Sequence, residues 1–409
     1  MQAPHTEPHF PAQPFFSTPQ QRLALARQRY FEEGVRPSGL VSEGVIQSWA
    51  RCLQARRRPH EALAFNPVTT SRVHSALARS RLLLEAAAND LSQLEATLAG
   101  TACTAILTDP HGVVVHATRN IARNDQVLMP LASRIGVCLA EECIGTNAPG
   151  VTAHTGQASA VLGGEHFFGC VQVMHCAAAP IRDVRGQLAA VLDLSSESQP
   201  FGFDAAAVVG LCATSIENRL LRAQSHEHIV VHFQTTLSLL ATPMECLAGV
   251  TSDGCLAWVN TAAARLLGQQ PQPASAPRAD EVFGLPLQRL SALTRQPQAL
   301  PHRLPNGLNI WLLARMQAAD GVGKAFSLGS AHDVSTAVPA AHKPAVGALE
   351  PLAPPTRAET PSRTTLRTAG QHLVEQTLTE CGGNVSMTAR RLGVSRGMVY
   401  RHVKNASAD

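Results

Sequence analysis

Three short helical segments, bounded by glycines and capping residues, occupy residues 366–404 near the end of the chain. In the first, apolar residues recur at helical spacing and stop at Gly382-Gly383. Asn384 is a favourable N-cap for the second, which ends at Gly393, and Ser395 is a favourable N-cap for the third. A helix, a glycine turn and a second capped helix form a helix-turn-helix, so this pattern predicts a small all-α module.

The charge of this module favours a nucleic-acid partner. Residues 363–404 hold seven Arg or Lys against two Glu, although the whole chain carries a net charge of only +4. The last helix of such a module meets base edges, while its basic neighbours meet phosphates. The predicted DNA-binding residues are Asn384, Ser395, Arg396, Met398, Tyr400, Arg401 and Lys404. A helical dimerisation module with incidental charge is the alternative that periodicity alone leaves open.

Residues 382–404 closely resemble the DNA-binding domain of Fis-type regulators, through the run Gly-Asn-Val-Ser-Met-Thr-Ala-Arg-Arg-Leu-Gly-Val-Ser-Arg that follows Gly382. The resemblance implies a homodimer, formed through the first helix, that binds double-stranded DNA. Thr388, Met398 and His402 depart from the usual residues of that run. Met398 would face the DNA groove, so the operator that family members prefer is not assumed for this chain.

Length and composition indicate several domains without a membrane span. A chain of 409 residues with 45% hydrophobic residues suits two or three globular domains joined by linkers. No apolar run is long enough to cross a bilayer, and the N-terminal residues lack the order of a secretory signal. We therefore expect a cytoplasmic protein whose ten cysteines are mainly reduced thiols.

The pattern along the chain predicts an α+β protein with an all-α C-terminal module. The predicted parts are a disordered tail (1–18), a helical segment (19–70), an antiparallel-sheet sensor domain (71–225), a weaker α+β domain (226–330), a Pro/Ala/Thr/Ser-rich linker (331–362) and the helix-turn-helix (363–409).

Apolar periodicity and turn residues place the elements of the sensor domain and of its neighbours. Helices are predicted over 20–29, 42–57, 71–100 and 141–154, and over a segment that begins at Asp204 and runs through Leu221. Strands are predicted over 102–109, 113–118, 158–162, 171–179 and 188–194. In the next domain, Ser252-Asp253-Gly254 predicts a turn before a strand over 255–260 and a helix that ends at Gly268.

Several runs resemble the GAF sensor domain of acetoin-catabolism regulators. They are Ile144–Gly150, Gly164–Phe168, Cys176–Ile181 and Gly186–Ser195, and Ile46–Leu53 resembles the helical motif that opens those proteins. Residues 228–325 resemble a degenerate PAS domain through Asp253-Gly254 and Asn260–Gly268. The resemblance implies a small-molecule effector of unknown identity on one face of the GAF sheet. The residues predicted to line this site are Thr146, Asn147, His166, His175 and Cys176.

The same domain also contains Cys138, Cys143 and Cys170, so a metal or thiol-redox sensor is an alternative function. Their spacing matches no standard zinc pattern, and free cysteines often simply pack in cores. We predict no metal, no cofactor and no catalytic residues, because no nucleophile–base set can be named. A protein-binding adaptor is a further alternative.

The resembling regulators usually carry a central AAA+ ATPase, which needs a phosphate-binding loop of the form G-x-x-x-x-G-K-[ST]. Gly323-Lys324 is the only candidate, but Ala318 stands where the first glycine is needed and Ala325 replaces the hydroxyl residue. We therefore expect no ATPase domain and no ATP hydrolysis.

Overall fold

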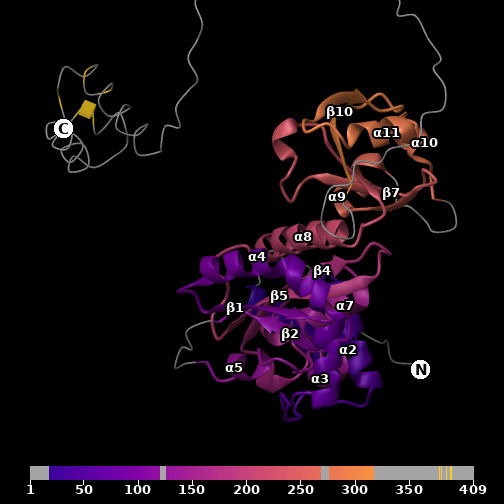
Figure 1. Cartoon of the computed structure of the whole chain (residues 1–409). Coiled ribbons are helices and arrows are strands. Elements are labelled where there is room, and N and C mark those ends of the chain that lie inside the picture. The colour runs from indigo at the N-terminus through magenta and orange to yellow at the C-terminus, as the bar shows by residue number, and fades with distance from the viewer. Residues whose placement is uncertain are drawn as a thin grey trace, which may run out of the picture. The chain divides into compact units, whose positions relative to one another are not determined.

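The computed structural model describes residues 18–119, 126–268 and 276–316, together with Thr377, Thr379, Asn384, Met387 and Thr388. The chain divides into two compact units, residues 1–330 and 331–409. The first unit contains two five-stranded antiparallel sheets with helices packed against them (Figure 1). The predicted combination of antiparallel sheets and flanking helices is therefore confirmed.

Four helices precede the first sheet: α1 (Pro19–Arg27), α2 (Glu43–Gln54), α3 (Thr70–Arg79) and α4 (Arg81–Leu98), with a π-helical turn at Gln28–Glu32 after α1. The helices predicted over 20–29 and 42–57 are confirmed to within a few residues. The single helix predicted over 71–100 is wrong, because Ser80 has φ −86° and ψ 3° and separates α3 from α4. Since α-helical ψ lies near −42°, the chain turns at Ser80. As a result α3 contacts β2, whereas α4 contacts β1 and α8.

The first sheet has the strand order β2-β1-β5-β4-β3. Its strands are β1 (Cys103–Thr108), β2 (Val114–Ala117), β3 (Ser159–Leu162), β4 (Met174–Arg182) and β5 (Leu188–Glu197). All five correspond to predicted strands. However, β4 begins three residues later than predicted, because Gly169–Val171 forms a 3₁₀ turn before it. The central strand β5 pairs antiparallel with both β1 and β4.

Both faces of this sheet are buried. On one face, alternate strand residues such as Leu107, Ala177 and Leu192 pack with α4 and α8 in one apolar cluster. On the opposite face, Ile106, Cys176 and Val191 belong to a second cluster with α2 and the segments between β2 and β4. Because side chains alternate along a strand, Ala190, Leu192 and Leu194 of β5 belong to one cluster and Val191 to the other.

The helix predicted over 141–154 is two helices, α6 (Glu141–Ile144) and α7 (Ala148–Thr155), and a short helix α5 (Met129–Ala132) precedes them. The interruption is at Gly145, whose φ is +71° and whose missing Cβ would lie 2.6 Å from Phe168 Cε2. Asn147 then caps α7, because its Oδ1 accepts from the Gly150 amide at 2.9 Å. Only glycine fits this close, left-handed turn, so the chain cannot continue as one helix.

The helix α8 (Ala205–Ala223) connects the two sheets. Asp204 caps it as predicted, because its carboxylate accepts from the Ala207 amide at 3.0 Å. The second sheet follows, with the order β8-β7-β6-β10-β9. Its elements are β6 (Ile229–Gln234), β7 (Cys246–Val250), β8 (Leu256–Val259), α9 (Thr261–Leu267), α10 (Ala279–Phe283), α11 (Leu287–Leu293), β9 (Leu300–Arg303) and β10 (Asn309–Met316). The predicted turn before β8 and the helix that ends at Gly268 are confirmed.

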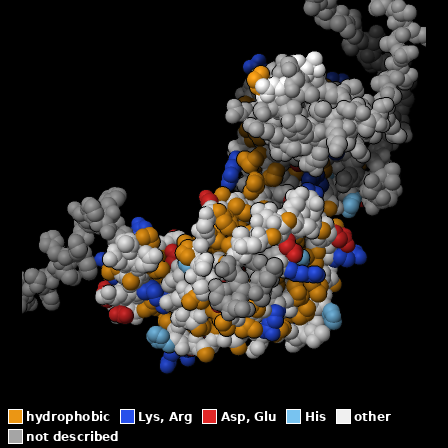
Figure 2. Space-filling model, turned by 90° about the vertical axis from the view of Figure 1, so that its left-hand side faces the viewer, with side chains coloured by type: hydrophobic (Ala, Val, Ile, Leu, Met, Phe, Trp, Pro, Cys, Tyr) orange, Lys and Arg blue, Asp and Glu red, His pale blue; other side chains and the backbone are white. Residues whose placement is uncertain are grey.

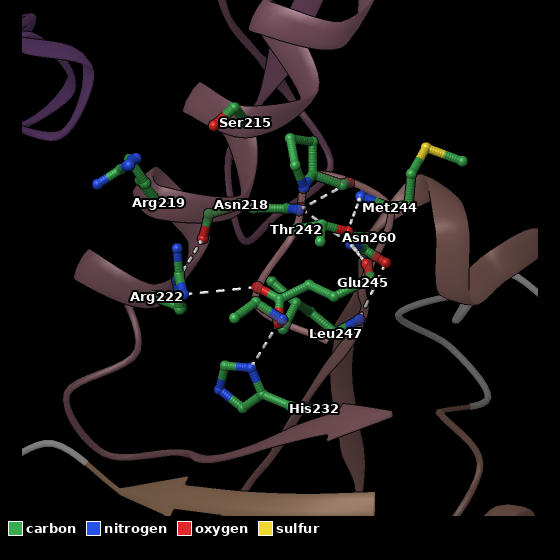
Figure 3. A network of polar contacts seen from close by, with 12 residues as sticks. Ser215, Asn218, Arg219, Arg222, His232, Thr242, Met244, Glu245, Leu247 and Asn260 are labelled. Atoms are coloured by element: carbon green, nitrogen blue, oxygen red, sulfur yellow. Dashed lines mark hydrogen bonds and ion pairs between the residues drawn. The ribbon is translucent and has the colours of Figure 1, made fainter. Parts of the chain in front are cut away.

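A polar network joins the C-terminal half of α8 to the second sheet (Figure 3). Asn260 Nδ2 donates to Asn218 Oδ1 at 2.8 Å. Glu245, only 2% exposed, lies 3.4 Å from Arg222 Nη1 and 3.1 Å from His232 Nδ1, and it also accepts from the Ala241 amide. Burial raises the pKa of the Glu245 carboxyl, but His232 and Arg222 more than offset this, so the pKa lies below its ordinary value.

Some large apolar side chains of the first unit are exposed at its surface. In Figure 2, apolar side chains are exposed at many separate points on the visible face of the first sheet region. The exposed large apolar side chains of the described residues include Val127, Leu131 and Ile135. Among the described residues, no helix has the length and apolar character needed to cross a bilayer.

Candidate ligand-binding site

A small cavity of about 40 Å³ lies on the face of the first sheet that is opposite to α4 and α8. Strands β1, β4 and β5 form its floor, and α5, the α6–α7 turn and the loop before β4 form its walls. Most of its lining is apolar, with a few polar groups on the floor and walls. The lining residues are Phe65, Ile106, Met129, Ala132, Leu139, Ile144, Asn147, Pro149, His166, Val171, Met174, Cys176, Asp193 and Ser195.

Four buried polar side chains form a chain of contacts along one side of the cavity. Cys176 Sγ lies 3.5 Å from His166 Nε2, and Ser195 Oγ lies 3.1 Å from Cys176 Sγ. The same hydroxyl donates to Asp193 Oδ2 at 2.6 Å. The register of β4 and β5 explains the arrangement, because Cys176 is paired directly with Ser195, and Asp193 lies two residues along on the same face.

The imidazole of His166 is neutral. Its Nδ1 lies 2.9 Å from the Gly163 carbonyl, which can only accept, so Nδ1 carries the proton and Nε2 is an acceptor. Burial lowers the pKa of His166 to about 4, even though the Gly163 contact acts in the opposite direction. The thiol of Cys176 therefore donates to Nε2.

The buried thiol of Cys176 is not an activated nucleophile. Burial, and then the nearby Asp193 carboxyl, raise its pKa well above the ordinary value. Reactive cysteines instead have a lowered pKa beside a cationic group. Among the described residues, no three His, Cys, Asp or Glu side chains lie close enough together to hold a metal ion. The surroundings of Cys176 therefore do not favour an activated thiol at this site.

The structure brings together three of the five predicted ligand-binding residues. Asn147, His166 and Cys176 line the cavity. Thr146 is buried beside it, but its hydroxyl contacts Ser48 Oγ of α2 at 2.7 Å and does not line the cavity. His175 does not line the cavity either, because strand alternation directs it away from the face that carries Cys176.

Sequence reasoning missed Asp193 and Ser195. The available signal was a carboxylate in the middle of the otherwise apolar strand 188–194, followed two residues later by a hydroxyl on the same face. Asp193 is 1% exposed, and burial raises its pKa to about 7, while the Ser195 hydrogen bond acts to lower it. Its Oδ1 has no hydrogen-bond partner in the part of the chain that the structure describes. A buried polar atom left without a partner costs about 1–3 kcal/mol, so this oxygen marks the cavity as a candidate site.

The N-terminal helices hold the walls of the cavity in place. Trp49 Nε1 of α2 donates to the Glu165 carbonyl at 2.7 Å, next to His166. Arg51 forms two hydrogen bonds with the buried Glu141 carboxylate at the start of α6. Arg27 of α1 donates to the carbonyls of Gly164, His166 and Phe167. The predicted helical segment at the N-terminus therefore positions the loop that carries His166.

A larger cavity of about 650 Å³ lies between the β4–β5 turn, α8 and β8. Its main polar groups already have protein partners. Arg182 donates to the Gly156 and Gly186 carbonyls, and Glu217 accepts from the Arg182 amide. Trp258, which also lines this cavity, has a buried indole Nε1 without a hydrogen-bond partner among the described residues.

The predicted DNA-binding residues lie outside the described residues, with the exception of Asn384. Its Oδ1 accepts from the Met387 amide at 3.2 Å, as expected of a helix N-cap. Thr388, which replaces the usual alanine, is fully buried, and its hydroxyl donates to the Asn384 carbonyl at 2.9 Å. The Thr388 hydroxyl therefore has a hydrogen-bond partner four residues earlier in the chain, so a threonine can be buried at this position.

Two segments of the chain match known protein families. Residues 18–211 match the MimR N-terminal domain, and residues 362–404 match the Fis family of bacterial regulatory proteins. The chain is 27% identical over 172 residues to the acetoin dehydrogenase operon transcriptional activator AcoR of Bacillus subtilis. It is 31% identical over 198 residues to the acetoin catabolism regulatory protein of Cupriavidus necator. These matches cover 41% and 47% of this chain but only 28% and 30% of those relatives.

Among solved structures, the Escherichia coli DhaR(N)–DhaL complex is similar at 18% identity, with a TM-score of 0.41, over 68% of this chain and all of that chain. The curated relatives are transcriptional regulators. The chain therefore combines an N-terminal segment homologous to those of acetoin- and MimR-type transcriptional activators with a C-terminal Fis-type helix-turn-helix segment.

Proposed function

We propose that this chain is a ligand-responsive, DNA-binding transcription regulator that acts as a homodimer in the bacterial cytoplasm. The observation that carries the proposal is the match of residues 362–404 to the Fis family. The small cavity of the first sheet supports the sensing part, because it is a buried, mainly apolar space lined by a few polar side chains.

In this proposal the first sheet region acts as a GAF-like sensor and the second as a degenerate PAS-like domain. The effector is a small molecule that binds beside Asn147, His166 and Cys176. The chain regulates without hydrolysing ATP, because the only candidate phosphate-binding loop, at Gly323-Lys324, lacks the required glycine and hydroxyl residue. Effector binding changes how two helix-turn-helix modules engage an inverted repeat with half-sites about one helical turn apart.

DNA binding is tested with the purified full chain, its own promoter and a scrambled fragment of equal length. We expect a preference for the promoter that weakens by orders of magnitude between about 50 and 200 mM salt, because bound phosphates release counterions. The absence of a salt-sensitive preference for the promoter would overturn the proposal.

Two substitutions distinguish a residue that contacts DNA bases from a residue that contacts DNA phosphates. Arg401→Ala is expected to cost about 1–3 kcal/mol and to relax specificity, whereas Lys404→Ala should weaken binding to all sequences and reduce the salt slope by about one. Arg357→Ala, in the linker predicted from the sequence, is the matched control. If both module variants bound as the control does, the module would not be the DNA reader.

A further inference from the structure

The larger cavity, of about 650 Å³, lies between the β4–β5 turn, α8 and β8, so it is in contact with both sheet regions of the first unit. Its volume falls within the range of ordinary ligand pockets, about 300–1,000 Å³. It shares no described lining residue with the small cavity of the first sheet. The two cavities are therefore separate candidate sites.

Trp258 of β8 gives this cavity a buried hydrogen-bond donor. The residue is 3% exposed and packs in a small apolar cluster with Leu221 of α8 and Leu247 of β7. Its Nε1 has no hydrogen-bond partner among the described residues. An indole Nε1–H can only donate, and buried tryptophans usually have a partner for it. The wall of the cavity therefore lacks an acceptor at this point.

The neighbouring strand fixes the position of this donor. Trp258 is paired with Gly249 of β7, and a Cβ at Gly249 would overlap the Nε1 and Cε2 atoms of the indole. Only a glycine leaves room for the ring at this place. The unpaired Nε1–H is thus held by the packing of β7 and β8 and does not turn freely toward solvent.

A second donor without a partner lies on the β4–β5 turn. Arg185 lines the cavity, and its guanidinium forms no hydrogen bond or ion pair with the residues that the structure describes. The adjacent residue, Val184, packs against the apolar cluster that contains Trp258. The guanidinium and the indole are therefore on the side of the cavity where the β4–β5 turn meets the second sheet.

The carboxylates that line the cavity already have protein partners. Asp183 accepts from two backbone amides of its own turn, and Glu217 accepts from the Arg182 amide at 2.9 Å. Asp253 accepts from the Thr251 hydroxyl. The contrast with Trp258 and Arg185 means that a ligand of this cavity is called on to supply acceptors.

Two donors of this kind restrict the chemistry of the ligand. A carboxylate has two acceptor oxygens, one for Trp258 Nε1 and one for the Arg185 guanidinium, and hydrogen bonds between charged groups are the stronger ones. An uncharged carbonyl would leave the Arg185 charge without a counterion, and an ammonium group would only bring further donors. Leu221, Leu256 and Val259 on the wall suit a hydrophobic skeleton.

We propose that this cavity binds an organic monocarboxylate with a hydrophobic skeleton, and that Trp258 and Arg185 donate to its two carboxylate oxygens. The site is distinct from the effector site of the proposed function, so it is a second ligand input. Helix α8 forms one wall of the cavity and also makes the polar contacts with the second sheet that Figure 3 shows. A bound carboxylate therefore links the two sheet regions and restricts their relative movement.

The experiment is calorimetric titration of the full chain with three probes that share one skeleton: 3-phenylpropionate, 3-phenylpropanamide and 3-phenylpropylamine. The carboxylate should bind roughly tenfold or more tightly than the amide, because the amide keeps an acceptor for Trp258 but lacks the charge for Arg185. The amine should bind most weakly. The phenyl skeleton is too large for the cavity of about 40 Å³, so binding of these probes reports on the larger cavity.

Two variants test the two donors. Trp258→Phe keeps an aromatic ring but removes the N–H, so the affinity for 3-phenylpropionate should fall about tenfold. Arg185→Gln should lower the affinity for 3-phenylpropionate about tenfold but change that for 3-phenylpropanamide by less than about twofold, because only the ionic contact is lost. Arg289→Gln, at an exposed position on α11, is the matched control and should bind all three probes as the wild type does.

Circular dichroism and thermal unfolding establish that each variant is folded. Arg185 lies on an exposed turn, so its substitution tests the site even where Trp258→Phe does not fold. Hydrogen exchange provides a second measurement. Exchange should slow in the C-terminal half of α8 and in β8 when 3-phenylpropionate is bound, and it should remain unchanged in α5, which borders the small cavity.

The proposal is overturned if no probe binds, if the amine binds best, or if folded Trp258→Phe and Arg185→Gln both keep the wild-type affinity for 3-phenylpropionate. Slower exchange in α5 with no change in β8 would place the probe in the small cavity and would also overturn it. The DNA assay of the proposed function uses no such probe, so the two proposals succeed or fail separately.

Discussion

The two sheets of the first unit present the same spatial arrangement of strands with a different order along the chain. In both, a central strand lies between two antiparallel hairpins. In the first sheet the central strand β5 follows both hairpins, whereas in the second sheet the central strand β6 precedes them. Each central strand carries a buried titratable residue, Asp193 in β5 and His232 in β6.

The surroundings of these two residues differ. His232 contacts the Glu245 carboxylate, which also lies close to Arg222 and accepts from the Ala241 amide (Figure 3). Asp193 has a partner for one oxygen only and lies beside a cavity. A buried titratable group is therefore weak evidence for a site by itself. The informative difference is that one Asp193 oxygen has no hydrogen-bond partner among the described residues, whereas the Glu245 carboxylate that contacts His232 has several partners.

Asp193→Asn is expected to have the largest effect, and the effect should be stabilising at alkaline pH. The folded pKa of Asp193, about 7, lies above its unfolded value of about 3.9. The unfolded chain therefore loses its proton first, and wild-type stability falls by about 4 kcal/mol as pH rises from about 4 to about 7. The variant should lack this fall, which urea unfolding of the ligand-free protein at a series of pH values would measure. A variant that is less stable than the wild type at pH 8 would show that Asp193 has a structural role like that of Glu245.

Glu245→Gln is expected to have the opposite sign. Removing the charge leaves Arg222 and His232 without their buried partner, and the loss should be about 3 kcal/mol. Because the folded pKa of Glu245 is lowered, its contribution is present above the ordinary Glu pKa of about 4.3 and is lost as pH falls through the folded pKa. The urea midpoint at pH 7 and at low pH measures both effects. Glu85→Gln, at an exposed position on α4, is the control. If Glu245→Gln and Glu85→Gln had equal urea midpoints, Glu245 would not stabilise the second sheet. Its difference from Asp193 in the first sheet would then be lost.

Ser48→Ala is expected to have a smaller effect, confined to the first sheet region. It leaves the fully buried Thr146 hydroxyl without the 2.7 Å contact to Ser48, at a cost of about 1–2 kcal/mol. Hydrogen exchange should increase in the α6–α7 turn and remain unchanged in β6 and β7. Faster exchange in both sheets would mean that the two regions open as one cooperative unit.

Much of the fold could be predicted from local signals. Strand alternation and turn residues located β1–β5, and the Asp204 cap located the start of α8, because these features depend on near neighbours. The break at Ser80 lets α3 contact β2, and the interruption at Gly145 lies against Phe168. Such long-range contacts leave no periodic trace in the sequence.

Long-range contacts also limited how much of the candidate site could be predicted from the sequence. Asn147, His166 and Cys176 were found through a family resemblance, but their neighbours Thr146 and His175 do not line the cavity. Asp193 required the register between β4 and β5, which puts it two residues from the partner of Cys176. The contacts of Thr146 with α2 likewise join residues that are distant in sequence.

The seven residues 198–204 connect β5 to α8, and α8 reaches the second sheet. The strand that carries Asp193 leads into a helix of 19 residues whose far half makes the Asn218–Asn260 hydrogen bond. Asn218 lies about 20 Å along the helix from its start, so a tilt of only about 5° at the strand end moves it by about 2 Å. That displacement exceeds the tolerance of a 2.8 Å hydrogen bond. A ligand-induced tilt of α8 of this size would therefore break the Asn218–Asn260 contact at the second sheet.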